Sequence, residues 1–284
     1  MDGLTLISSI FSFAMGACIA SFLNVVIWRV PRGESIVKPA SHCPKCYAPI
    51  KWYQNIPILS WLALRGKCAN CKEPISPRYI LIELLGGCLF VLAFFYYNPF
   101  YPFYWAPMVI FLLKAWVWIA LMIVGSMIDF DHKLLPDFVT VGGMILGVGV
   151  SLFVSILTGF SRDVWVVQTF YPLFQSLIGL VFGFGLLWLV RFFGSKAFKR
   201  EAMGLGDVFL MGAVGALFGP VSVLVTLILS SVFGSIVGLL MVALSKAKLG
   251  KFVEIPYGPY ICLGCLVWMF WGPQLVNWYM NCFK

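Results

Sequence analysis

Long apolar runs constrain this chain more than any other feature, because an α-helix needs roughly 20 apolar residues to cross a bilayer. The composition agrees: 61% of the residues are hydrophobic and only 11% are charged, whereas a soluble domain is about half apolar and a quarter charged. The sequence therefore predicts an all-α polytopic membrane protein with about eight transmembrane helices. We place them at 4–28, 79–97, 107–128, 138–158, 172–193, 205–219, 221–245 and 258–275.

The runs divide the chain into three parts. Residues 1–28 lack a basic n-region and a small-residue cleavage pattern, so we expect an uncleaved first transmembrane helix rather than a signal peptide. Residues 29–78 are the only segment large enough to fold outside the bilayer. Residues 79–284 hold the other seven runs and are expected to form the membrane domain.

Basic residues predict the orientation, since Lys and Arg in short loops stay in the cytoplasm. Of the 20 basic residues, 17 lie in the loops after the first, third and fifth runs and before the eighth. The opposite loops hold only Arg162, and the C-terminal end only Lys284. We therefore expect both termini on the periplasmic side. The net charge of +9 is interpreted as an orientation signal and a contact with anionic lipid, not as nucleic-acid binding.

Two cysteine pairs in the segment 29–78 predict a zinc site. Cys43-Pro-Lys-Cys46 and Cys68-Ala-Asn-Cys71 are separated by 21 residues, close to the usual spacing of roughly 15–20 in four-thiolate sites. A domain this small has a weak core, and a bound metal is a common way to stabilise it. Four Cys ligands indicate a closed, structural site. Two disulfides are the alternative, which a reducing cytoplasm disfavours.

Acidic residues at the ends of apolar runs are the candidate catalytic groups. Placing a carboxylate at the edge of a membrane helix costs free energy, so such a residue is usually functional. Asp207 follows Gly204-Leu-Gly206, and we expect the two glycines to ease an open backbone beside it. Asp129 directly follows the third run, with Asp131 as its alternative. Asp137 precedes the fourth run and is interpreted as a helix cap.

Asp129 and Asp207 lie on different predicted helices and, by the charge distribution, at the same membrane face. Two carboxylates at one dry site share a proton and can activate water against a peptide carbonyl. This pair predicts an aspartyl protease. Glu83 lies near the same face, either as an ion-pair partner or as a functional acid. A cation transporter and a zinc-bearing scaffold remain open as other classes.

The motifs taken together resemble those of type IV prepilin peptidases, a family of bacterial inner-membrane GxGD aspartyl proteases. The resemblance covers nearly the whole chain. It rests on Ser21–Val26 with Arg29 and Pro31, both cysteine pairs, Asn55-Ile-Pro57, Gly66-Lys67, Arg78-Tyr79 with Glu83, Ile128–Asp137, Gly204-Leu-Gly206-Asp207 and Pro256-Tyr-Gly258-Pro259-Tyr260.

The resemblance implies that Asp129 and Asp207 are the catalytic pair and that the four cysteines hold zinc. It implies cleavage of prepilin and pseudopilin leaders after a glycine, on the cytoplasmic side of the bacterial inner membrane. It also implies methylation of the new N-terminal residue by S-adenosylmethionine, with Gly66 and Lys67 associated with that activity. Gly204, Gly206, Glu83 and Asp131 are expected to support the site or bind substrate. Which pilus or secretion system is served, and the oligomeric state, stay open.

Overall fold

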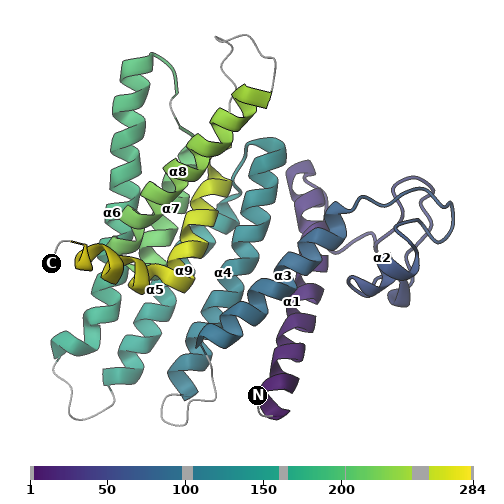
Figure 1. The fold of residues 1–284 in the computed structure, drawn as a ribbon, viewed down its shortest axis with the longest axis horizontal. Helices are drawn as coiled ribbons and strands as arrows, with labels where there is room; N and C mark the ends of the chain where they lie inside the picture. The colour runs from purple at the N-terminus through teal and green to yellow at the C-terminus, as the bar shows by residue number, and fades with distance from the viewer. Residues whose placement is uncertain (1–2, 98–104, 160–165, 202, 245–255, 283–284) are drawn as a thin grey trace. The chain divides into compact units, whose positions relative to one another are not determined.

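The computed structural model describes residues 3–97, 105–159, 166–201, 203–244 and 256–282 (Figure 1). These ranges are almost wholly helical, and their only β structure is two isolated bridges. The chain divides into two compact units, residues 1–124 and 125–284. The helices are α1 (Gly3–Arg29), α2 (Leu59–Ala63), α3 (Arg78–Tyr97), α4 (Trp105–His132), α5 (Asp137–Gly159), α6 (Val166–Phe198), α7 (Leu205–Phe218), α8 (Pro220–Leu244) and α9 (Gly258–Asn281), with short 3-10 turns at Val30–Arg32 and Trp52–Gln54.

All eight predicted runs form helices. Seven of them, α1, α3, α4, α5, α6, α8 and α9, are long and apolar enough to cross a bilayer. The sixth run forms α7, whose 14 residues reach only about 21 Å, short of the roughly 30 Å hydrocarbon core. Gly219, with φ +84°, ends this helix directly before Pro220 begins α8. Arg162 and the lysines expected before the eighth run, Lys246, Lys248 and Lys251, lie outside the described residues.

In the first unit, small residues let α1 and α3 pack closely. A Cβ atom added at Gly16 would lie 2.6 Å from the backbone oxygen of Gly86, and one added at Gly86 would lie 2.6 Å from the Cβ of Ala20. Trp116 of α4 stacks on Phe90 of α3, with ring centroids 5.2 Å apart, and its indole N–H donates to the Phe90 carbonyl. Close approach of small residues is a usual basis of helix association in membranes.

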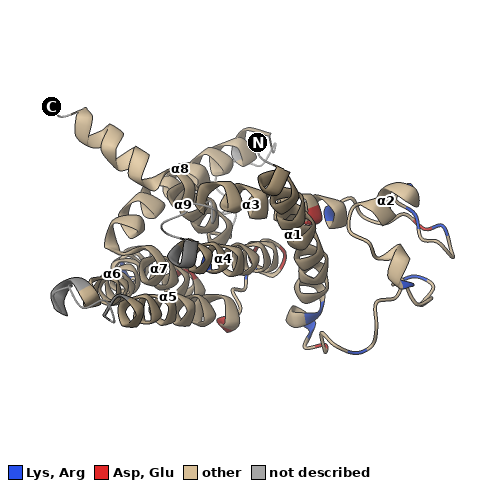
Figure 2. Cartoon of the chain, turned by 90° about the horizontal axis from the view of Figure 1, so that it is seen from below, with Lys and Arg blue, Asp and Glu red and all other residues tan. Residues whose placement is uncertain are grey.

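Charged residues of the first unit gather on the loop that follows α1 and on the adjoining helix ends (Figure 2). Arg29 and Arg32 end α1 and its 3-10 extension, and Arg78 begins α3. The long apolar helices themselves carry few charges. The loop and these helix ends therefore form one basic region of the unit.

In the second unit, α7 packs against α5, α6, α8 and α9. Gly179 of α6 faces Gly215 of α7 with backbone against backbone, and Gly183 meets the backbone of Met211. These two glycines let α6 and α7 pack closely, whereas Gly185 has open space where a Cβ would stand. The core therefore surrounds α7, and its first turn carries Asp207 into the bundle.

The α6–α7 crossing predicts a sharp contrast between two glycines of one helix. Gly179→Ala should destabilise the protein by about 1–3 kcal/mol, because the added methyl overlaps the Gly215 backbone. Gly185→Ala on the same helix should leave stability unchanged or slightly raised, since nothing lies within 4 Å of its Cβ position. Thermal unfolding of both variants in detergent checks this. Equal unfolding temperatures would contradict the packing described.

Candidate functional site

The four cysteines of the segment 29–78 come together in the first unit. Their sulfur atoms all lie within 4.8 Å of one another, and Cys43 and Cys71 Sγ are 3.8 Å apart. A tetrahedral ion with metal–sulfur bonds of about 2.3 Å separates its ligands by about 3.8 Å. All nine cysteines are free thiols in the structure. The arrangement therefore suits one metal ion, as the spacing predicts.

The two cysteine pairs lie on two small hairpins of the same kind. The amide of Cys43 donates to the Ala48 carbonyl, and that of Cys68 donates to the Glu73 carbonyl. Tyr47 and Lys72, each four residues after the first cysteine of its pair, both have positive φ, at 57° and 61°. The hairpins are thus two copies of one turn, and this repeat explains how both pairs present their thiols to one point.

Backbone N–H groups favour thiolates at two of these cysteines. A hydrogen bond from the Ala48 amide, followed by one from the Asn70 side chain, lowers the pKa of Cys46 to about 6. Hydrogen bonds from the Cys71 and Asn70 amides lower the pKa of Cys68. The thiolate is the form that binds metal, so these turns favour metal binding at Cys46 and Cys68. At Cys71 a hydrogen bond from the Glu73 backbone lowers the pKa, but burial and the three neighbouring thiols raise it further, to about 12.

Two buried charges attach this loop to the helices of its unit. Arg29 donates to the carbonyls of Ser35 and Pro39 at 2.9 and 2.8 Å. Glu83 Oε2 on α3 accepts a hydrogen bond of 2.8 Å from the Ile58 amide. Ile58 is β-branched with φ 63°, a conformation that costs about 1–3 kcal/mol and needs such support. Glu83, predicted as a supporting or substrate-binding acid, therefore holds the loop in place.

In the second unit, Asp129 lies one turn before the end of α4 and is only 6% exposed. Its Oδ2 accepts a hydrogen bond of 3.0 Å from the backbone N–H of Gly258, the first residue of α9. The first N–H groups of a helix have no partner within the helix and carry partial positive charge. The N-terminus of α9 therefore compensates the buried carboxylate of Asp129.

Asp207 lies in the first turn of α7 and is 8% exposed. Its charge and that of Asp129 are close enough to interact. Among the described residues, its Oδ1 has no hydrogen-bond partner although it is buried. An orphaned carboxylate oxygen of this kind requires an explanation, and a site for water or substrate is the usual one. The structure thus brings together the two acids that the sequence singled out.

Three glycines surround this pair, and Leu135 links two of them. A Cβ at Gly258 would lie 2.7 Å from Asp129 Oδ2, so any side chain would displace the carboxylate. A Cβ at Gly206 would lie 2.8 Å from the Cβ of Leu135, whose Cδ1 would stand 3.3 Å from a Cβ at Gly258. Gly204 is extended, with φ −64° and ψ 146°, and α7 begins directly after it. Gly206 is therefore helical, and close packing rather than an open backbone accounts for it.

Four further residues named by the sequence analysis are Asp131, Asp137, Gly66 and Lys67. Asp131 is exposed, on the outer surface of the last turn of α4, and Asp137 begins α5, also exposed. Gly66 has φ +66° and is covered by the ring of Trp61, 2.8 Å from its Cβ position. Its N–H and carbonyl are both used within the loop, by Trp61 and Ile75. Lys67 is exposed beside it.

Sequence reasoning missed several neighbours of the acids. Leu135 lies in the short segment between α4 and α5, where the sequence shows no pattern that would mark it as a site residue. Cys262 is buried, and its thiol bonds to Ser126 and is close enough to interact with both aspartates. Tyr257 fixes the start of α9 through its hydroxyl, 2.7 Å from that of Ser230 on α8. The Pro-Tyr-Gly-Pro-Tyr segment was the available signal, and on its own it indicated only a turn.

Two parts of the chain match known protein families. Residues 14–97 match the bacterial peptidase A24 N-terminal domain, and residues 116–239 match the type IV leader peptidase family. No solved structure matches the chain significantly.

Three relatives cover almost the whole chain, and each is named prepilin leader peptidase/N-methyltransferase. The protein of Myxococcus xanthus is 38% identical over 95% of this chain and 74% of its own length. That of Stutzerimonas stutzeri is 33% identical, over 95% and 93%. That of Pseudomonas aeruginosa is 32% identical, over 94% and 91%.

The cysteine cluster predicts a stoichiometric metal. Elemental analysis of protein purified under reducing conditions should find about one ion per chain. Cys68→Ser should lower this content and loosen the loop, whereas Cys88→Ser on α3, outside the cluster, should leave it unchanged. Reduced wild-type protein that contains no metal would refute the site.

Proposed function

Because the chain belongs to the type IV leader peptidase family, we propose that it is an aspartyl endopeptidase of the bacterial inner membrane. It cleaves the leader peptides of type IV prepilins and type II secretion pseudopilins after a glycine. It then methylates the new N-terminal residue with S-adenosylmethionine. The observation that supports the proteolytic step most strongly is the convergence of Asp129 and Asp207, which are buried and interacting although they come from separate helices.

The surroundings of the two acids suggest different roles. The Gly258 N–H satisfies Asp129 Oδ2 in its charged form, so we assign Asp129 as the base that accepts a proton when water attacks the scissile carbonyl. Asp207 keeps an oxygen without a partner in the described part of the chain. We assign it as the protonated member, which donates a hydrogen bond to the carbonyl oxygen as negative charge develops there.

Zinc is the metal that we propose for Cys43, Cys46, Cys68 and Cys71. Four thiolates in a tetrahedral arrangement suit zinc, and leave no open coordination position for a reacting molecule. The ion therefore has a structural role, holding together a loop domain that lacks a large core. This role is consistent with its place in the first unit, while both aspartates belong to the second.

S-adenosylmethionine, when bound, supplies an electrophilic methyl group. Within the pair predicted for this activity, Gly66 fits a supporting role because Trp61 covers it and its backbone groups are already bonded. Lys67 is exposed and is the group of the pair that would meet the donor's carboxylate. The loop domain is thus the part of the chain that we assign to methyl transfer.

The orientation that we propose places the basic loop after α1 and the aspartates at the cytoplasmic face. The distribution of Lys and Arg supports it, as does the placement of Asp129 near the end of α4 and of Asp207 at the start of α7. The substrates are membrane-anchored prepilins, and the bilayer is the other partner.

The proteolytic assignment predicts that Asp129→Asn and Asp207→Asn each reduce prepilin cleavage by at least about 100-fold, because each removes half of the acid–base pair. Asp131→Asn, which alters an exposed acid two residues away, should cleave normally. The measurement is leader removal from a prepilin in membranes that contain equal amounts of each variant. Cleavage at the wild-type rate by both of the first two variants would overturn the assignment.

Gly258 provides a second test, because it positions Asp129 without taking part in the chemistry. Gly258→Ala should lower cleavage about 100-fold, since the added Cβ would lie 2.7 Å from Asp129 Oδ2 and displace it. Gly142→Ala on α5 adds the same methyl into open space and should leave the rate unchanged. If the two variants cleave equally well, the Gly258–Asp129 contact has no role in catalysis.

A further inference from the structure

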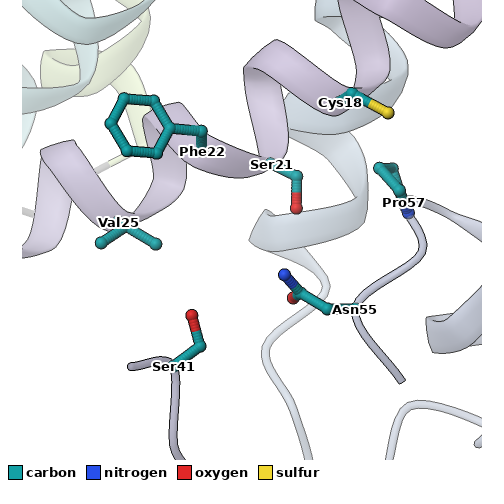
Figure 3. A pocket seen from close by; sticks show the side chains of 7 residues that line it. All are labelled: Cys18, Ser21, Phe22, Val25, Ser41, Asn55 and Pro57. Carbon is teal, nitrogen blue, oxygen red and sulfur yellow. The ribbon is translucent and has the colours of Figure 1, made fainter. Parts of the chain in front are cut away.

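A cavity of about 280 Å³ lies within the first unit, between α1 and the loop domain. One wall is a strip of α1, and the others are the start of the first cysteine hairpin and the segment before α2 (Figure 3). The lining residues are Cys18, Ser21, Phe22, Val25, Ser41, Asn55 and Pro57. None of them is a metal ligand, and none belongs to the aspartate site.

The polar side chains of the cavity are available to a ligand. The hydroxyls of Ser21 and Ser41 and the amide of Asn55 approach one another from three separate segments (Figure 3). Within the described part of the chain, these three side chains make no hydrogen bond. Phe22 and Val25 provide an apolar wall beside them, and Phe22 is 49% exposed.

The walls of the cavity are held in place by the two buried charges of the unit. Arg29 binds the carbonyls of Ser35 and Pro39, just before Ser41. Glu83 binds the amide of Ile58, just after Pro57. The buried arginine and glutamate therefore fix the distance between each loop wall and the helices. A cavity held in this way is preformed, which reduces the cost of binding.

We propose that this cavity binds the N-terminal residue of the cleaved substrate and is the amine-acceptor site for methylation. The proposal rests on the proposed function, since it requires a cleavage product with a free α-amine. Asn55, Ser21 and Ser41 hold the amine and the first peptide group. Phe22, Val25 and Pro57 contact the side chain of the substrate's N-terminal residue. Because these three side chains are apolar, we expect that residue to be apolar as well.

Size and charge favour the amine acceptor over the methyl donor. The volume is slightly below the range of about 300–1,000 Å³ usual for drug-sized ligands, so one terminal residue fits better than a donor built of adenosine and an amino acid. The lining contains no charged side chain, whereas the donor carries a carboxylate, an ammonium and a sulfonium. Because the lining has no carboxylate, it offers no ion pair that would hold the amine in its charged, unreactive form.

Methyl transfer to the amine needs no reagent other than the donor and water. The α-ammonium first loses a proton to water. The lone pair of the resulting amine bonds to the methyl carbon of the sulfonium donor, and the sulfur–carbon bond breaks with its electron pair left on sulfur. The products are an N-methylammonium and a neutral thioether, so the positive charge passes from sulfur to nitrogen.

The test uses the full-length enzyme in detergent and a synthetic peptide that has an N-terminal phenylalanine followed by apolar residues. Asn55→Ala should raise the KM for peptide methylation roughly five- to tenfold, as expected for one lost hydrogen bond, and leave the KM for S-adenosylmethionine unchanged. Gln54→Ala, which alters the adjacent amide outside the cavity, is the matched control. Peptide binding without the donor, measured by fluorescence anisotropy, should weaken by the same factor.

A second variant tests the apolar wall. Phe22→Ala should reduce the preference for N-terminal phenylalanine over N-terminal alanine roughly tenfold. Phe11→Ala, on the same helix and exposed but outside the cavity, should not change it. Prepilin cleavage by all four variants should stay at the wild-type rate.

The outcomes separate the cavity from the function on which it rests. If wild-type enzyme cleaves prepilin but never methylates, the methyltransferase part of the proposed function fails, and the acceptor site with it. If wild-type enzyme methylates while Asn55→Ala and Phe22→Ala behave as wild type, only the acceptor site is overturned. A rise in the donor KM instead of the peptide KM would reassign the cavity to the donor and overturn the proposal.

Discussion

The second unit depends on the burial of two carboxylates in an apolar helix bundle. A charge there costs several kcal/mol unless it is compensated, and the fold compensates both with helix N-termini. Asp207 occupies the first turn of α7, and Asp129 accepts the first N–H of α9. The short α7, enclosed by four other helices, and the glycines at 206 and 258 serve this arrangement, because each allows a backbone or side chain to approach closely.

The first unit solves a different problem, since a loop of about 50 residues has too small a core to fold securely alone. Its four cysteines are arranged to bind one metal ion, and Arg29 and Glu83 bind backbone groups of the loop. The loop is therefore attached firmly to α1 and α3, and the cavity beside Asn55 follows from that attachment. A cysteine cluster suited to one metal ion and two buried, hydrogen-bonded side chains together take the place of a large core.

Much of this was predictable from the sequence, for identifiable reasons. Apolar length predicts the helices, and Cys-x2-Cys spacing predicts the cysteine cluster. Asp129 is distinguished from Asp131 by its position directly behind an apolar run. Periodicity carries no information on which helix ends meet, so the contact between Asp129 and Gly258 was not predictable, nor was the role of Leu135. The sequence predicts Glu83 as a supporting or substrate-binding acid but does not identify its partner, because an acid near a membrane face gives the same pattern whether it binds a substrate or a backbone amide.

The most direct measurement of the central claim is the proximity of the two aspartates. In a variant that keeps the four cluster cysteines and replaces the other five, Asp129→Cys combined with Asp207→Cys should be joined by a short bifunctional thiol reagent in folded protein. Asp131→Cys combined with Asp207→Cys, which places one thiol on the outer surface of α4, should not be. Cross-linking of the first pair alone supports one catalytic site. Failure of the first pair to cross-link in protein with a wild-type unfolding temperature would contradict the account.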